Sequence, residues 1–174
     1  HKSWELGERL KELNCIHEIT KTTAVTSIPT EEVFSRVLEI IPNSFQYPEI
    51  TVAEIQFQDK EFFSSGYRDY KKFIKADIRF IDEVKGAVIV GLTKELPESE
   101  RPFLPDEEKL IASIAEILSK FLQKRRSRKM LMQTELHLNK AQEISKTGSW
   151  TFLLNSEKVS ASQEAALNQR CTKT

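Results

Sequence analysis

The sequence predicts an α+β domain, in which an antiparallel sheet is covered by N-terminal and C-terminal helices and the C-terminal helix is long. Three observations lead to this class. Apolar residues near the start of the chain recur at helical spacing, the middle alternates apolar and polar residues with a period of two, and the last third returns to helical spacing. One compact core is expected, because single domains usually organise roughly 100 to 200 residues and the chain has 174.

The first helix is expected over residues 3–26. Its main stripe advances by alternating steps of four and three residues, through Leu6, Leu10, Leu13, His17 and Thr20. Ile16 and Ile19 add a neighbouring stripe. The helix is therefore expected to face a core on one side and a partner helix on the other.

A second helix is expected from Thr30, which is placed as its N-cap, with Glu31 and Glu32 near the positive end of the helix dipole. Its apolar face consists of Val33, Val37, Leu38, Ile40 and Ile41. Prolines at positions 42 and 48 then end helical continuity.

Strands are expected from residue 50 onward. Residues 50–58 alternate apolar and polar and turn at 59–60 into residues 61–63, which predicts a hairpin. A second alternation over residues 74–81 predicts a strand with one buried and one wet face. The nearly continuous apolar run within residues 84–92 suits a central strand.

The longest helix is expected to begin at Pro105 and the three acids that follow it, after a polar loop over residues 93–104. Two adjacent apolar seams run along it. The first consists of Leu110, Ile114, Ile117 and Phe121, and the second of Ile111, Ala115, Leu118 and Leu122. One seam is expected to cover the core and the other to pair with another helix. The first seam's spacing continues through Leu131 and Leu138, as in a helical signal connector.

Composition and charge narrow the function classes. The 26 basic and 26 acidic residues cancel, so no global field favours nucleic acid or an anionic membrane, and neither is expected as a partner. No stretch approaches the roughly 18 apolar residues of a membrane span, which predicts no membrane insertion and a cytoplasmic location. Because the chain begins without methionine, we expect it to be part of a longer polypeptide.

The final helix carries a family resemblance. Residues 103–115 resemble the last-helix signature of GAF domains, residues 86–92 resemble the glycine-led strand before it, and residues 12–20 resemble the first helix of GAF sensors in prokaryotic histidine kinases. The resemblance covers roughly residues 5–123. It implies a sensory domain with a sheet-lined ligand region.

A second resemblance begins at Leu138. Residues 138–150 resemble the entry to a PAS domain, whose first strand is then expected over residues 150–154. These resemblances divide the chain into a GAF-like domain (1–123), a helical linker (124–136) and the N-terminal part of a PAS-like domain (137–174). The last part is too short to complete a PAS core.

Few residues are candidates for a catalytic or metal-binding role. His17, followed by an acid, superficially resembles a kinase phosphoacceptor box, although a helix-surface histidine explains it as well. Cys15 and His17 point about 200° apart on a helix and cannot share a metal. Cys15 and Cys171 are taken as free thiols, and no metal site is expected. The basic run at residues 124–129 reads as an anionic contact or as a solvated linker helix.

The GAF resemblance also implies where a ligand would bind. Tyr67, Tyr70 and Phe73 are candidates to line a small pocket beside the sheet, or to plug a core. The cyclic-nucleotide subgroup's Asn-Lys-x-Asp-Glu signature is missing, and the loop region carries no cysteine of the kind that bilin-binding or redox-active relatives use. No cofactor is assigned.

Three hypotheses result. The first is a non-catalytic sensory or relay domain of a signal-transduction histidine kinase, which forms a parallel homodimer through its first and last helices and signals to downstream PAS and kinase modules. The dimer and signalling residues would be Leu110, Ile114, Ile117 and Phe121. The alternative is a small-molecule or haem sensor with an occupied pocket. A GAF enzyme resembling free methionine-sulfoxide reductase is the third, and it lacks the paired loop cysteines that such chemistry requires.

Overall fold

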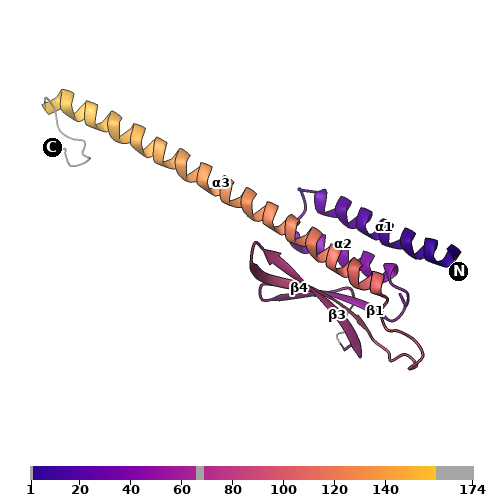
Figure 1. Cartoon of the computed structure of the whole chain (residues 1–174). Helices are drawn as coiled ribbons and strands as arrows, with labels where there is room; N and C mark the ends of the chain where they lie inside the picture. The colour runs from indigo at the N-terminus through magenta and orange to yellow at the C-terminus, as the bar shows by residue number, and fades with distance from the viewer. Residues whose placement is uncertain (1, 66–68, 160–174) are drawn as a thin grey trace. The chain divides into compact units, whose positions relative to one another are not determined.

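The computed structural model describes residues 2–65 and 69–159, with side chains described as far as residue 145. Its elements in chain order are α1 (Lys2–Ala24), α2 (Thr30–Ile40), the 3-10 helix η1 (Ile41–Ser44), β1 (Thr51–Phe57), β2 (Lys60–Phe63), β3 (Lys72–Phe80), β4 (Glu83–Leu92) and α3 (Pro105–Val159) (Figure 1). The predicted α+β class is confirmed. The chain divides into two compact units, His1–Lys124 and Arg125–Thr174.

The sheet lies entirely in the first unit. Its strand order is β2-β1-β4-β3, and every neighbouring pair is antiparallel. The hairpin of β1 and β2 and the central place of β4 are as predicted. Gly86 is required where β4 pairs with the end of β1, because a Cβ atom there would lie 2.1 Å from the Gln56 carbonyl oxygen.

The core fills one face of the sheet. Side chains alternate between the two faces of a strand, so Ala53 and Ile55 of β1 and Val88 and Val90 of β4 point to the same side, where they are buried. Figure 1 shows α1, α2 and the start of α3 on that side. Phe34 of α2 meets the sheet edge-on, with its ring centroid 5.1 Å from that of Phe62 and 5.9 Å from that of Phe57.

The start of α2 differs by one residue from the prediction. Pro29, not Thr30, is the N-cap, and its carbonyl accepts hydrogen bonds from the amides of Glu32 and Val33. Pro29 makes no side-chain cap hydrogen bond. The proline ring fixes φ at −66°, which suits the extended residue before a helix, so Thr30 is drawn into the first turn.

The strand predicted at residues 150–154 is wrong, because these residues lie within α3. A strand needs a neighbour to bond its backbone, whereas a helix satisfies its backbone groups internally. Residues 160–174 lie outside the described part of the chain, so the PAS-like assignment stays a prediction. Among the described residues, no helix is long and apolar enough to cross a membrane.

Candidate functional site

The sheet face turned away from the helices carries a buried carboxylate. Glu54 of β1 alternates with the core residues Ala53 and Ile55, so it points to the opposite face, yet only 3% of it is exposed. Its Oε1 atom accepts a hydrogen bond from Gln56 Nε2 at 2.6 Å, and its Oε2 atom accepts a short hydrogen bond from the Tyr70 hydroxyl. A buried ionisable group stays buried only with such partners.

Tyr70 covers this carboxylate. Its ring lies over β4 at Gly91, where a Cβ atom would come within 2.5 Å of the ring's first carbon. Burial, followed by the hydrogen bond to Glu54, raises the pKa of the Tyr70 hydroxyl above its ordinary value. The hydroxyl therefore stays a donor at neutral pH.

The three predicted pocket aromatics have different outcomes. Tyr70 is half-buried on the sheet, while Phe73 is mostly exposed, with its ring centroid 5.7 Å from that of Tyr70. Tyr67 lies outside the described residues. Sequence reasoning missed Glu54, because the alternation of apolar and polar residues in its strand assigned it to a solvent-exposed face.

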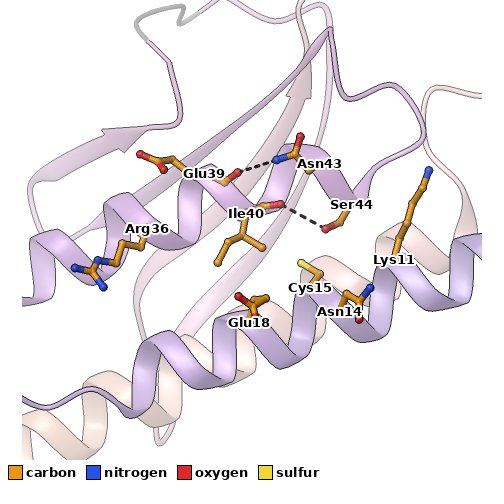
Figure 2. A pocket seen from close by; sticks show the side chains of 9 residues that line it. All are labelled: Lys11, Asn14, Cys15, Glu18, Arg36, Glu39, Ile40, Asn43 and Ser44. Carbon is orange, nitrogen blue, oxygen red and sulfur yellow. Dashed lines mark hydrogen bonds between the residues drawn. The ribbon is translucent and has the colours of Figure 1, made fainter.

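An open groove of about 530 Å³ lies between α1 and α2 (Figure 2). Charged and polar side chains line most of it: Lys11, Asn14, Cys15, Glu18, Arg36, Glu39, Ile40, Asn43 and Ser44. Cys15 is buried against α2 and η1, and burial raises the pKa of its thiol, which a hydrogen bond with Ser44 partly offsets. His17 is exposed, so the two residues do not share a site.

A smaller cleft, of about 250 Å³, lies between the first half of α1 and the start of α3 and is strongly acidic. Glu107 accepts hydrogen bonds there from the backbone amides of Leu104 at 2.7 Å and Gln46 at 2.6 Å, which caps the helix. Burial, with smaller contributions from Glu8 and Glu12, raises the pKa of Glu107. Within residues 2–65 and 69–159, no group of acids, histidines and cysteines could hold a metal ion.

The predicted signalling seam of α3 lies inside the first unit. Leu110, Ile114 and Phe121 are buried, and Ile117 is half-buried. The second seam is buried as well. Residues of both seams belong to one buried core, so both seams are used within the domain itself. A surface that pairs with another helix would therefore be formed by residues outside these two seams.

Helix α1 carries an exposed apolar stripe. Cys15 and Ile19 face the core, while three leucines point outward: Leu6 is 72% exposed, Leu10 58% and Leu13 66%. This is the stripe with alternating steps of four and three. Within the part of the chain that the structure describes, its three leucines remain more than half exposed.

Comparison with known proteins finds similarity among solved structures. No family model matches the chain, and no curated protein matches it. Among solved structures, the chain is similar to the A. aeolicus nlh2 GAF domain in an inactive state, with a TM-score of 0.49 and 18% sequence identity. The alignment covers 68% of this chain and 99% of that one.

Proposed function

We propose that this chain is a non-catalytic sensory or relay domain of GAF type, belonging to a cytoplasmic sensor histidine kinase. It passes a change in helix packing to downstream PAS and kinase modules. The observation that carries the proposal is the exposed leucine stripe of α1. A helix that is anchored in the core on one face and apolar on the other is suited to hold a second helix, and helix pairing is a state that a stimulus can change.

The partner that fits this stripe is a second copy of the chain, in parallel orientation. Steps of four and three residues are the a and d positions of a coiled coil, which place Leu6, Leu10 and Leu13 along one seam. The second unit, taken by itself, repeats the feature, because Leu131 and Leu138 lie seven residues apart and are 62% and 60% exposed.

The expected dimer is weak and reversible. Burying a leucine contributes about 1.5–3 kcal/mol, so the six partly exposed leucines of two α1 helices contribute on the order of 6–12 kcal/mol. Association costs on the order of 4–15 kcal/mol. At the favourable end of these ranges the net free energy is about −8 kcal/mol, which corresponds to a dissociation constant of about 1 μM. Such a weak pair suits a relay, because a small change in either term changes the populations of paired and unpaired helices.

Sedimentation velocity at micromolar concentrations tests this proposal. The unmodified chain should sediment as a dimer and Leu10→Asp as a monomer. Asn14→Asp is the matched control, because it adds the same charge to an exposed position of the same helix. Aspartate at Ile114 or Phe121 would place a charge in the core and report on folding instead. A chain that is monomeric throughout, or an equal effect of both α1 variants, would count against the dimer.

A second candidate function is a small-molecule or haem sensor. The hydrogen-bonded pair of buried Glu54 and half-buried Tyr70 favours it, because a few precisely placed polar groups orient a ligand in a pocket. An absorption spectrum, native mass spectrometry and thermal shifts with a metabolite panel test it, with Tyr70→Phe as the site variant. A clean apo protein without any ligand-induced shift would exclude this function for the compounds used.

A further inference from the structure

One residue of strand β3, Arg79, is hydrogen-bonded to helix α3 through both of its backbone groups. The backbone amide of Arg79 donates a hydrogen bond to Ser119 Oγ at 3.0 Å, and the Arg79 carbonyl accepts one from Gln123 Nε2 at 3.1 Å. Both polar backbone groups of one strand residue are thus bonded to side chains of one helix. We call these three residues the clasp.

The position of β3 in the sheet explains why these groups are available. β3 lies at an edge of the sheet, so one side of its backbone has no neighbouring strand. In antiparallel pairing, the N–H and C=O groups of one residue point to the same side. α3 therefore replaces a strand at this residue, with Ser119 and Gln123 spaced four residues, about one helical turn, apart.

The local register supports the same arrangement. Ile78 pairs with Gly86, but Arg79 pairs with Val84, so the register of β3 and β4 shifts between Ile78 and Arg79. The extra residue, Lys85, lies in β4, and a bulge of this kind increases the local twist of the strand pair. Here the register shift lies directly before the residue that bonds to α3.

Ser119 joins the strand to the helix. Its hydroxyl accepts from Arg79 and also donates to the Ala115 carbonyl of α3 at 2.7 Å, and the residue is buried. A hydroxyl can do both at once. Ser119 and Gln123 both lie close to Lys124, where the first unit ends.

The other end of β3 adjoins the buried carboxylate. Tyr70, two residues before the strand, bonds to Glu54, and the Lys71 amide bonds to the Leu92 carbonyl at 2.8 Å. β3 therefore connects the outer face of the sheet to α3, and it pairs with β4 along its length with one register shift, between Ile78 and Arg79.

We propose that the clasp is the regulatory connection of this domain, through which a change at the Glu54–Tyr70 pair reaches α3. The inference rests on the proposed relay function, since it names the route inside that relay. Release of Tyr70 would loosen the start of β3 and the pairing of β3 with β4, and Arg79 would carry the change to Ser119 and Gln123. This transmission from Tyr70 to α3 does not depend on the identity of the stimulus or on the pairing of two copies of the chain.

Amide hydrogen exchange by NMR, on the full chain, tests the clasp in two stages. Ser119→Ala removes the acceptor of the Arg79 amide, so exchange of that amide should rise about tenfold. Ser113→Ala is the matched control on an exposed position of the same helix and should leave it unchanged. Gln123→Glu removes the other donor without changing the side chain's shape, and Gln133→Glu controls for its charge.

The second stage measures coupling. Tyr70→Phe should speed exchange of the α3 amides over residues 119–124 severalfold in the unmodified background, and should add nothing in the Ser119→Ala background. A merely structural role of Ser119 would leave the Tyr70→Phe effect the same in both. That result, or an Arg79 amide as well protected in Ser119→Ala as in Ser113→Ala, would overturn the inference. The test stays valid for a monomeric chain, so its failure is distinguishable from failure of the dimer.

Discussion

Helices α1 and α2 lie on the same side of the sheet but are built differently. α2 buries Val33, Phe34, Val37 and Leu38 and exposes charged residues, as a finished core helix does. α1 is twice as long, yet its buried residues are Cys15 and Ile19. Its outward face carries leucines where α2 carries glutamate and arginine.

The two helices differ in how much of their apolar surface is buried within one chain. Exposed apolar side chains are common singly, but a row of them along one helix face marks a surface that another element covers. In the proposed dimer, α1 therefore takes a further partner and α2 does not. The inward face of α1 is also weakened near its start, where Glu8 and Glu12 meet the acids of α3.

The largest expected difference comes from truncating one side chain in each helix. Phe34→Ala should lower the free energy of unfolding by about 3–5 kcal/mol, because it leaves a cavity in the core. Leu10→Ala should change it by less than about 0.5 kcal/mol, since the side chain is solvated within one chain. Urea denaturation at concentrations where the chain is monomeric measures both, and equal losses would break the comparison.

The Cys15 thiol reports on how firmly α1 is held. The Cys15 side chain is 2% exposed, so labelling by a disulfide reagent requires α1 to open, and burial also raises the pKa of the thiol, which lowers the reactive thiolate fraction at pH 8. In a Cys171→Ser background, the rate should be at least about tenfold slower than in urea and should fall as protein concentration rises.

An exposed cysteine on α2 controls for this measurement. Ser35→Cys, in a background without Cys15 and Cys171, should react at a rate that does not depend on concentration. If Cys15 behaved in the same way, pairing of copies would not involve α1.

A smaller effect concerns the acidic side of α1. Burial, then Asp106 and Glu8, raise the pKa of Glu12, although Arg9 and Lys109 oppose this. The folded chain therefore holds a proton on Glu12 at a pH where the unfolded chain has released it. Glu12→Gln should be more stable than the unmodified chain at pH 7, by about 0.5 kcal/mol. This advantage should shrink as the pH falls through the raised pKa towards 4.5; a constant advantage would contradict it.

The smallest expected effect lies on the outward face of α2. Arg36→Ala removes an exposed ion pair with Glu32 four residues earlier, and should cost about 0.3 kcal/mol at low salt and less at high salt. Chemical denaturation at two salt concentrations measures this. A loss above about 1 kcal/mol would show that this face is not merely solvated.

Much of the sheet and of α2 could be predicted from the sequence, because each has one apolar face whose period is unambiguous. The orientation of α1 could not be predicted. The leucine stripe and the stripe of Ile16 and Ile19 are both apolar, and which one meets the core depends on packing with α3. The burial of both α3 seams could not be predicted either, because two adjacent apolar seams do not show whether one or both of them face the core.

The candidate site on the outer face of the sheet was predicted only in part. Tyr70 was identified among the aromatic residues, but its partner Glu54 was not, since a period of two distinguishes faces and not what covers each face. The cover comes from Tyr70, which precedes β3 and whose position no local pattern specifies. The clasp has a similar origin, because Ser119 and Gln123 lie 40 and 44 residues from Arg79.

Disulfide cross-linking along α1 tests the central claim, a parallel pairing of two α1 helices, most directly. In a Cys15→Ala, Cys171→Ser background, Leu6→Cys and Leu13→Cys should each form a disulfide-linked dimer rapidly on oxidation. Parallel helices bring both positions next to their own copies, within the reach of about 7 Å between Cα atoms that a disulfide allows. Asn14→Cys should cross-link slowly. Cross-linking at only one of the two leucine positions would indicate an antiparallel pair, and equal rates at all three positions would contradict the pairing altogether.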